Sequence, residues 1–314
     1  MSPKPKSKKV TVPELVAMKG RGEKITMVTC YDATFMRILD QAGVEMVLVG
    51  DSLGMVIQGR SSTLEVTLED MIYHGRIVAR GLTHAHLVLD MPFGSYQVSV
   101  EEAARNAARL VKEGGAESVK VEGGREVAAV VHAIHRMGVP VVGHLGLTPQ
   151  SIHQLGGFRI QGRTRDTAQA LLEDAQALEE AGAFAIVLEG IPGELAEKVT
   201  AAIRVPTIGI GAGPGCDGQV LVIYDLLGMD NNWNPKFTKK YANLNDVIVK
   251  AVSAYIEDVK SGSFPGPGAH LPLSRMPWTR SRRSPRCSRG ASASAARDAA
   301  SRSSPPWATS TKGT

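Results

Sequence analysis

Short apolar segments alternate along this chain with longer segments in which apolar residues recur at helical spacing. Runs rich in Val, Ile and Leu without polar alternation are typical of strands buried on both faces of a sheet. We therefore predict eight strands. They cover residues 25–30, 46–49, 87–89, 118–121, 140–143, 184–188, 207–210 and 220–224.

The segments between these strands carry the helical pattern, and several of them end at a glycine such as Gly43, Gly138 or Gly182, which is a common signal for a helix C-terminus. Alternating strands and helices require a parallel sheet, and eight repeats favour closure into a (β/α)8 TIM barrel. An open, doubly wound sheet is the alternative. The predicted helices are 33–42, 68–80, 100–114, 126–137, 165–181, 192–202 and 247–260, with a short one at 12–19.

Composition divides the chain into three parts. Residues 1–10 are rich in Lys and Pro and are predicted to form a flexible arm. Residues 11–268 form the predicted barrel domain. Residues 269–314 consist mainly of Arg, Ser, Ala and Pro, and such a segment buries too little apolar surface to fold, so we expect disorder.

Charge and cysteine content narrow the class of protein. The formal net charge is +5, but residues 271–314 contribute +8, which leaves −3 for the rest, so a nucleic-acid partner of the folded part is not supported. No apolar run reaches the length of a membrane span, and the N-terminus lacks the apolar core of a secretory signal. Three cysteines without metal-ligand spacing, Cys30, Cys216 and Cys287, favour a reducing cytoplasm.

Acidic residues stand at the carboxyl ends of three consecutive strands. Asp51 follows the second strand, Asp90 the third and Glu122 the fourth. Neighbouring barrel strands lie about 5 Å apart, so these side chains should converge at the rim where α/β barrels carry out their chemistry. Three close carboxylates repel one another unless a cation lies among them, and oxygen ligands favour Mg²⁺, with Mn²⁺ or Co²⁺ as substitutes.

Two further charged residues complete the predicted site. Lys120 lies two residues before Glu122, and because strand side chains alternate, both point to the same face, where the lysine would recognise an anionic substrate. Glu189 ends the sixth strand, across the rim from the other acids, where it would remain free of the metal and act as a base.

Other polar residues near strand ends have simpler interpretations. Asp32, Asp70 and Asp217 are predicted to be helix caps or loop acceptors. His144 is interpreted as a polar residue near the rim that would contact the metal-binding side chains rather than the metal itself. The glycine-rich stretch 209–213 suits a plain turn best, with phosphate binding or close approach to a substrate as alternatives.

Several motifs together resemble the ketopantoate hydroxymethyltransferase family, whose members are also called 3-methyl-2-oxobutanoate hydroxymethyltransferases. The resemblance runs from about residue 25 to residue 266. Its motifs are TCYD at 29–32, VGDSLG at 49–54, KVEGG at 120–124, GHLGLTPQ at 143–150, GGF at 156–158, QGR at 161–163, LE at 188–189 and GIGAG at 209–213.

The resemblance implies a barrel of the phosphoenolpyruvate mutase/isocitrate lyase group and a cytoplasmic homo-oligomer, typically a homodecamer. It also implies transfer of a hydroxymethyl group from the co-substrate 5,10-methylenetetrahydrofolate to 3-methyl-2-oxobutanoate. The products implied by the resemblance are 2-dehydropantoate and tetrahydrofolate, on the route to pantothenate, and the implied reaction proceeds through a Mg-stabilised enolate.

The family pattern also implies roles for individual residues. Asp51, Asp90 and Glu122 would hold Mg²⁺, with Glu122 acting directly or through water. The 2-oxo acid would be held by two of these residues, Asp51 and Asp90, together with Ser52 and Lys120. Glu189 would accept the substrate proton. The chain departs from the family at Tyr224, where members commonly have His, and residues 271–314 lie outside the resemblance.

Two rival functions follow from the same sequence. The first is a Mg-dependent lyase or mutase of the same barrel group that acts on a 2-oxo acid without folate. The second is a protein that binds nucleic acid or another anionic surface through the Arg-rich segment 271–314.

Overall fold

A computed structural model describes residues 8–229 and 238–266 of the 314-residue chain. The chain divides into two units after Glu257, and the described part of the second unit is residues 258–266. Most of the predicted arm and tail, the boundary at residue 268 and Cys287 lie outside the described residues.

Eight parallel strands close into a barrel in the order of the sequence. Closure is made by β1 and β8, which pair in parallel with Ile25 opposite Gly218. The predicted (β/α)8 barrel is confirmed and the open sheet is excluded. The strands are β1 (Ile25–Thr29), β2 (Met46–Val49), β3 (His86–Asp90), β4 (Ser118–Glu122), β5 (Val141–Gly146), β6 (Ala183–Glu189), β7 (Thr207–Ile210) and β8 (Gly218–Leu221).

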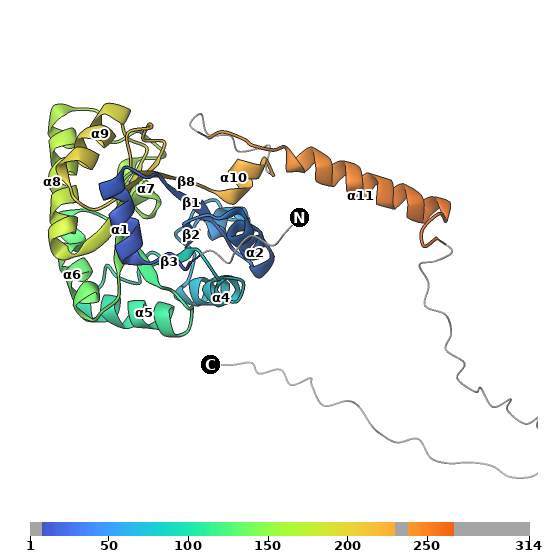
Figure 1. The fold of residues 1–314 in the computed structure, drawn as a ribbon, viewed down its shortest axis with the longest axis horizontal. Helices are drawn as coiled ribbons and strands as arrows, with labels where there is room; N and C mark the ends of the chain where they lie inside the picture. The colour runs from blue at the N-terminus through green and yellow to red at the C-terminus, as the bar shows by residue number, and fades with distance from the viewer. Residues whose placement is uncertain (1–7, 230–237, 267–314) are drawn as a thin grey trace, which may run out of the picture. The chain divides into compact units, whose positions relative to one another are not determined.

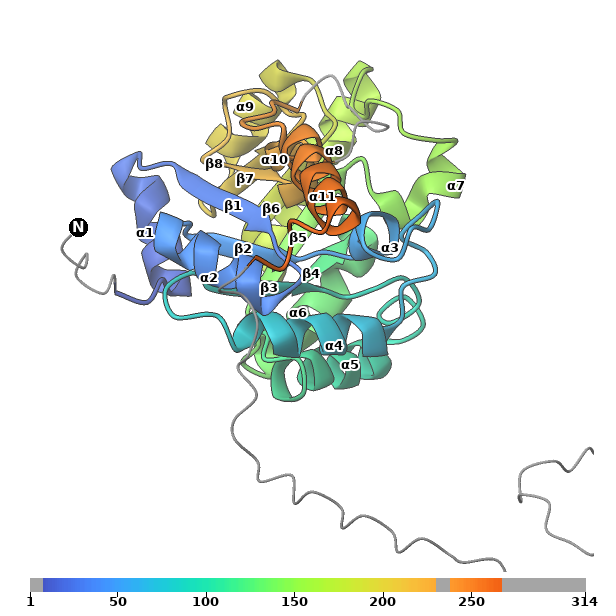
Figure 2. The same cartoon turned by 90° about the vertical axis from the view of Figure 1, so that its right-hand side faces the viewer.

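Helices surround the strands, and neighbouring helices such as α4 and α5 lie side by side (Figures 1 and 2). Because both faces of the sheet are covered, every residue of β2, β3 and β4 is buried. The helices are α1 (Val12–Arg21), α2 (Ala33–Ala42), α3 (Leu53–Val56), α4 (Leu68–Ala79), α5 (Val100–Lys112), η1 (Arg125–Val127), α6 (Ala128–Arg136), η2 (Pro149–Ser151), α7 (Ile152–Leu155), α8 (Arg165–Ala181), α9 (Gly193–Ala202), α10 (Ile223–Leu227) and α11 (Leu244–Ser261).

The eighth predicted strand is wrong at its end. Residues 220–224 were expected to be extended, but β8 stops at Leu221 and Ile223 begins α10. The backbone N–H of Ile223 donates to Thr29 Oγ1 at 3.1 Å, which fixes this turn out of the barrel. The sequence is apolar throughout this stretch, and a short apolar run does not distinguish a strand from the start of a helix.

Three aspartates have the structural roles predicted for them. Asp32 caps α2 by accepting hydrogen bonds from the backbone N–H groups of Thr34 and Phe35. Asp70 completes a capping box with Thr67 at the start of α4. Asp217 accepts from the backbone N–H of Thr207 at 2.9 Å. These carboxylates are committed to the backbone, which leaves the acids at the strand ends available for chemistry.

Residues 8–10, which we assigned to the flexible arm, are packed against the barrel domain. The backbone N–H of Val10 donates to His84 O at 2.8 Å, and the Val10 side chain is buried. Lys9 forms an ion pair with Glu117 at 2.7 Å. The described part of the chain is therefore anchored two residues before the predicted start of the domain.

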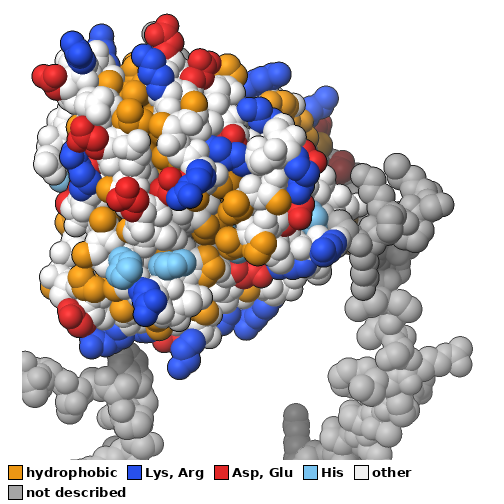
Figure 3. All heavy atoms as spheres, turned by 60° about the vertical axis from the view of Figure 1, so that its left-hand side comes forward, with side chains coloured by type: hydrophobic (Ala, Val, Ile, Leu, Met, Phe, Trp, Pro, Cys, Tyr) orange, Lys and Arg blue, Asp and Glu red, His pale blue; other side chains and the backbone are white. Residues whose placement is uncertain are grey.

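Acidic and basic side chains are interspersed over the face shown in Figure 3. Cys30 and Cys216 are buried free thiols. Within residues 8–229 and 238–266, no helix is long and apolar enough to cross a membrane.

Candidate active site

A cavity of about 840 Å³ opens at the carboxyl end of the barrel. We call it the central pocket. Its volume lies within the range of about 300–1,000 Å³ that is usual for ligand pockets. The six residues selected from the sequence all line it: Asp51, Ser52, Asp90, Lys120, Glu122 and Glu189.

Asp51 and Asp90 are held together by the backbone at the end of β2. The N–H of Asp51 donates to Asp90 Oδ2 at 3.0 Å, and both side chains are buried. A Cβ atom at Gly50 would lie 2.8 Å from Ser52 Oγ, so a side chain at this position would force the Ser52 hydroxyl to move. Ser52 Oγ is in turn 2.9 Å from the hydroxyl of Tyr31.

Lys120 supplies positive charge among the acids. Its Nζ lies 3.2 Å from Asp90 Oδ1 and 3.9 Å from Glu122 Oε1. Burial opposes protonation of the amine, but Asp90, Glu122 and Asp51 outweigh it and raise the pKa of Lys120 above its usual value. The side chain is therefore an ammonium ion inside the barrel.

The positive charge of Lys120 affects the pKa values of the three acids to different extents. Burial raises the pKa of Asp51 well above its usual value, and the charges of Asp90 and Glu122 add to this effect. Burial also raises the pKa of Asp90, against the opposing charge of Lys120. Asp51 and Asp90 therefore form a pair of carboxyl groups whose full ionisation requires additional positive charge.

Glu122 differs from the two aspartates because its oxygen atoms already have partners. Oε2 accepts from the backbone N–H of Gln150 at 2.9 Å, and Oε1 is 3.1 Å from His144 Nδ1. Burial opposes ionisation, but His144, Lys120 and the Gln150 N–H together hold the pKa of Glu122 below its usual value. Glu122 is therefore the acid that is ionised most easily.

His144 lies between two glutamates. It sits opposite Glu122 in the pairing of β4 with β5, and its Nε2 is 3.2 Å from Glu189 Oε2 on β6. Burial and Lys120 oppose protonation of the imidazole, but Glu122 and Glu189 raise the pKa of His144 to about 9. In the protonated form Nδ1 donates to Glu122, so its 3.1 Å approach to Lys120 Nζ is not a hydrogen bond.

Glu189 lies apart from the aspartates and remains partly accessible at the end of β6, with 19% of its side chain exposed. This is the position expected for a free base. Gly146 allows its backbone to come close, because a Cβ atom there would lie 2.1 Å from Glu189 O. His144 connects this carboxylate to the group of acids on β2, β3 and β4.

Sequence reasoning missed two polar residues of the site, Gln150 and Tyr96. Gln150 Nε2 donates to Asp51 Oδ2 at 2.8 Å and to Met91 O at 2.9 Å. The hydroxyl of Tyr96 donates to Gln150 Oε1 at 2.7 Å and accepts from the backbone N–H of Glu122 at 3.0 Å. Gln150 belonged to a motif used for the family resemblance, but nothing in its own spacing predicts contact with Asp51, 99 positions away.

The glycine-rich stretch 209–213 and Tyr224 also reach the central pocket. Gly211, from the glycine-rich stretch 209–213, lines it, and so does Tyr224. The ring of Tyr224 lies 6.2 Å from that of Tyr31, at an angle of 54°. The position that departs from the family pattern is therefore part of the pocket wall.

The carboxylate oxygen atoms of Asp51, Asp90 and Glu122 are the candidate ligands for a divalent cation. In the part of the chain that the structure describes, no three His, Cys, Asp or Glu side chains are arranged to bind one ion directly. Asp90 Oδ1 is nevertheless buried with an ion-pair contact to Lys120 Nζ at 3.2 Å, and Asp51 lies beside it as a second buried carboxyl group. Mg²⁺ commonly uses only one or two carboxylates and keeps several waters, so this pair fits Mg²⁺ with Glu122 reached through water.

Comparison with known proteins places the chain in a family. The sequence model described as Ketopantoate hydroxymethyltransferase matches residues 9–267. The 3-methyl-2-oxobutanoate hydroxymethyltransferase of Pelobacter propionicus is 56% identical over 258 residues, covering 82% of this chain and 96% of the relative. The protein of the same name from Syntrophus aciditrophicus is 57% identical over 265 residues, covering 84% of this chain and 97% of the relative.

Solved structures show the same fold at low sequence identity. One is 2,3-dimethylmalate lyase, a PEP mutase/isocitrate lyase superfamily member, with a TM-score of 0.52 and 17% identity over 85% of this chain and 92% of that chain. Another is phosphonopyruvate hydrolase in complex with oxalate and Mg²⁺, with a TM-score of 0.53 and 15% identity over 83% and 91% of the two chains. The barrel thus has the fold of that superfamily, and the chain belongs to the ketopantoate hydroxymethyltransferase family.

Proposed function

We propose that this protein transfers a hydroxymethyl group from 5,10-methylenetetrahydrofolate to 3-methyl-2-oxobutanoate, forming 2-dehydropantoate and tetrahydrofolate for pantothenate biosynthesis. The observation that carries the proposal is the arrangement of charge in the central pocket. The buried pair Asp51 and Asp90 would ionise fully only with added positive charge, Lys120 supplies one buried ammonium, and Glu189 stands nearby in contact with His144. Relatives more than 50% identical bear the name of this enzyme.

Asp51 and Asp90 are the residues that would hold Mg²⁺. The close approach of these two buried carboxyl groups and the raised pKa of Asp51 both support a cation at this point. Glu122 would act through a water molecule, because its oxygen atoms are already engaged by His144 and Gln150. When bound, the ion supplies Lewis-acid withdrawal of electrons from the 2-oxo acid, which makes the C3 proton more acidic.

Lys120 and Ser52 are the residues proposed to orient the 2-oxo acid beside Asp51 and Asp90. The Lys120 ammonium attracts the negative charge of the substrate, and burial makes this attraction stronger than it would be in water. The Ser52 hydroxyl, kept in place by Tyr31, is a short-range hydrogen-bond donor or acceptor. Together they would hold the substrate with C3 directed toward Glu189.

Glu189 is proposed to remove the C3 proton. His144 Nε2 lies 3.2 Å from this carboxylate and would hold it in position to accept the proton. The electron pair of the C3–H bond then forms the enolate. The enolate carbon attacks the methylene group, which bridges two folate nitrogens, and the bond to one nitrogen breaks as the C–C bond forms. Water then replaces the second nitrogen on the transferred carbon. The two released nitrogens take the two protons that come from C3 and from the water.

The test is to follow exchange of the substrate C3 proton with deuterium oxide in the absence of folate. The wild-type protein with Mg²⁺ should exchange it, and Glu189→Gln should still bind Mg²⁺ and the 2-oxo acid but lose exchange. Exchange at the wild-type rate in that variant would reject Glu189 as the base. Glu197→Gln, on α9 and away from the lining of the central pocket, is the matched control.

Product analysis with and without methylenetetrahydrofolate separates this function from a folate-independent lyase or mutase. A transferase forms 2-dehydropantoate only when the folate is present. Cleavage or rearrangement of a 2-oxo acid without folate would favour the rival. A protein shortened to residues 1–270 should retain transfer, whereas a function as an anionic-surface binder would be lost with the Arg-rich segment.

We also propose a homo-oligomer, a homodecamer by the family pattern, in the reducing cytoplasm. Helix α11 exposes several large apolar side chains, and exposed apolar surface of this kind commonly marks a protein interface. Free buried thiols at Cys30 and Cys216 suit a reducing compartment. Sedimentation velocity of the full chain at several concentrations gives the number of subunits.

A further inference from the structure

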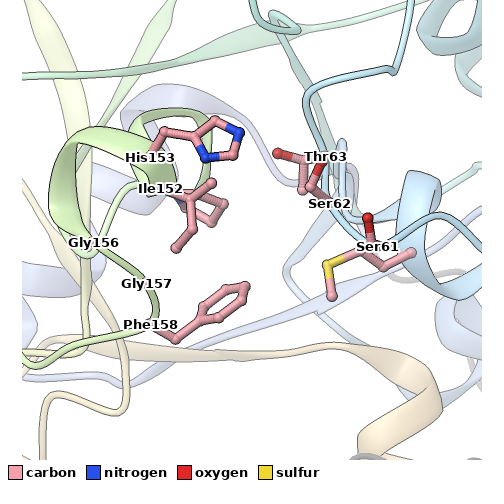
Figure 4. A pocket seen from close by; sticks show the side chains of 10 residues that line it. Ser61, Ser62, Thr63, Ile152, His153, Gly156, Gly157 and Phe158 are labelled. Atoms are coloured by element: carbon pink, nitrogen blue, oxygen red, sulfur yellow. The ribbon is translucent and has the colours of Figure 1, made fainter.

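A second cavity of about 370 Å³ lies beside the central pocket. We call it the side cleft. Residues 61–63, which follow α3, form one wall, and residues 152–158, in α7 and the loop after it, form the other (Figure 4). Met55, Thr63, Pro149 and Phe158 line both cavities, so a ligand in the side cleft adjoins one in the central pocket.

We propose that the side cleft binds the pteridine ring of the folate co-substrate. This inference rests on the proposed function and assigns a position to the second substrate. The one-carbon unit of the folate would project past the residues that both cavities share and reach the 2-oxo acid in the central pocket. The chemistry sought is therefore a flat, neutral heterocycle with several hydrogen-bonding atoms on its edge.

The charge of the lining supports a neutral ligand. Asp51, Asp90, Lys120 and Glu122 all face the central pocket, whereas the ten residues that line the side cleft include no Asp, Glu, Lys or Arg. An anionic 2-oxo acid is drawn to the central pocket by Lys120. The central pocket therefore suits the anionic 2-oxo acid, and the side cleft suits the neutral pteridine ring.

An aromatic surface supports a flat ligand. The Phe158 side chain is 50% exposed although it lies in the wall of a cavity. Gly156 and Gly157 precede it with φ of 69° and 109°, a backbone that other residues rarely adopt, and this turn carries the ring to the cleft. Aromatic rings stack favourably on flat heterocycles, so the exposed part of this ring is a suitable surface for one.

A buried hydroxyl supports a polar edge. Thr63 is only 3% exposed, yet its Oγ1 has no hydrogen-bond partner. Buried polar groups are normally paired, so an unpaired one in a cavity wall points to a ligand atom. Figure 4 shows Thr63 with Ser61 and Ser62 on one side of the cleft, and the His153 imidazole on the other, so donors and acceptors face the space from both sides.

Binding of tetrahydrofolate, measured by calorimetry with the full chain and Mg²⁺, tests the proposal. Ile152 lines the side cleft but not the central pocket, so Ile152→Trp should fill the cleft and weaken tetrahydrofolate binding at least tenfold. The loss of folate affinity should exceed any loss of C3 proton exchange by tenfold or more. Ile38→Trp, the same change at an exposed position on α2, is the matched control.

A second pair of variants keeps the test decisive if Ile152→Trp does not fold. Phe158→Ala should weaken tetrahydrofolate binding about tenfold, and Phe158→Tyr, which keeps an aromatic ring, should restore it to within threefold of the wild type. Wild-type affinity in every folded cleft variant would overturn the side-cleft assignment while leaving the proposed function intact. Absence of tetrahydrofolate binding and transfer in the wild type would instead overturn the proposed function.

Discussion

His144 Nε2 lies 3.2 Å from Glu189 Oε2, while Nδ1 of the same ring is 3.1 Å from Glu122 Oε1. The imidazole therefore joins the acids of the first half of the barrel to the single carboxylate proposed as the base. Both contacts are made inside the protein, since His144 is almost fully buried. A buried ring with two such partners has little freedom to rotate.

Loss of this ring should slow proton removal. His144→Gln keeps a polar side chain but cannot carry the positive charge that orients Glu189. Misplacement of a reacting group by about 1 Å can cost on the order of 100-fold in rate, so we expect C3 proton exchange to fall by about that factor. Exchange followed by nuclear magnetic resonance measures it, with the exposed His132→Gln on α6 as control. Exchange within twofold of the wild type would remove His144 from the mechanism.

Metal-free protein should become less stable as pH rises above neutrality. The pKa of folded His144 is raised to about 9 from an ordinary value near 6.5, so the folded state binds more protons between these pH values. The free energy of unfolding therefore decreases across this window. Urea titrations in EDTA at pH 6, 7.5 and 9 measure it.

His144→Gln should flatten that alkaline dependence. His86 provides the opposite case, because burial lowers its pKa to about 4 and stability is lost as pH falls from 6.5 toward that value. His86→Gln should therefore change the acidic side only. An unaltered alkaline slope in His144→Gln would show that another group titrates there.

Lys120 should be essential for the stability of the barrel without metal. Lys120→Met leaves Asp51, Asp90 and Glu122 buried without their ammonium partner, and removal of one member of a buried ion pair costs about 3–5 kcal/mol. Added Mg²⁺ should recover part of this loss because it replaces positive charge. Urea unfolding in EDTA and in Mg²⁺ measures both effects, and Lys112→Met, at an exposed site, should change stability by less than about 0.5 kcal/mol.

Gly146 should tolerate no side chain. Its φ is 96°, and a Cβ atom would lie 2.1 Å from Glu189 O, so Gly146→Ala must move the strand that carries the proposed base. Gly138→Ala is a close control, because Gly138 has φ of 88° but open space around the added atom. We expect Gly146→Ala to be less stable than Gly138→Ala by about 1–3 kcal/mol and to lose proton exchange. Equal stability of the two variants would show that Glu189 moves freely.

Removal of metal should stop C3 proton exchange, and Mg²⁺ should restore it. Asp90→Asn removes the negative charge beside Asp51 and should weaken Mg²⁺ binding on the order of 100-fold. Asp32→Asn, at a helix cap, should leave Mg²⁺ affinity unchanged. Calorimetric titration with Mg²⁺ distinguishes them, and equal affinities would place the ion elsewhere.

The sequence predicts the barrel and its charged centre because both depend on local patterns. Short β-branched runs mark the strands, and an acid at the end of a strand is carried to the rim once the barrel closes. Asp51, Asp90, Glu122 and Glu189 follow from this rule. Lys120 follows from the alternation of strand side chains, since it lies two residues before Glu122, and all five residues line the central pocket. Where the pattern is ambiguous, as at residues 220–224, the boundary is wrong, because Ile223 turns away to pair with Thr29.

The supporting contacts are harder to predict. Gln150 reaches Asp51 from η2, and Tyr96 reaches Glu122 from the loop after β3. These side chains are uncharged and lie in irregular segments, where no periodicity indicates direction. Their partners are determined by how loops from separate strands meet in space. The same limit applies to the side cleft, whose two walls are about 90 residues apart in the sequence.

The position of Lys120 has a consequence for how the protein matures. With an ammonium already among the carboxylates, the polypeptide carries its own counter-charge and can complete its barrel before any ion arrives. Folding and metal binding would then be separate events. Under the proposed function, a shortage of magnesium would lower the number of working active sites without lowering the amount of folded protein.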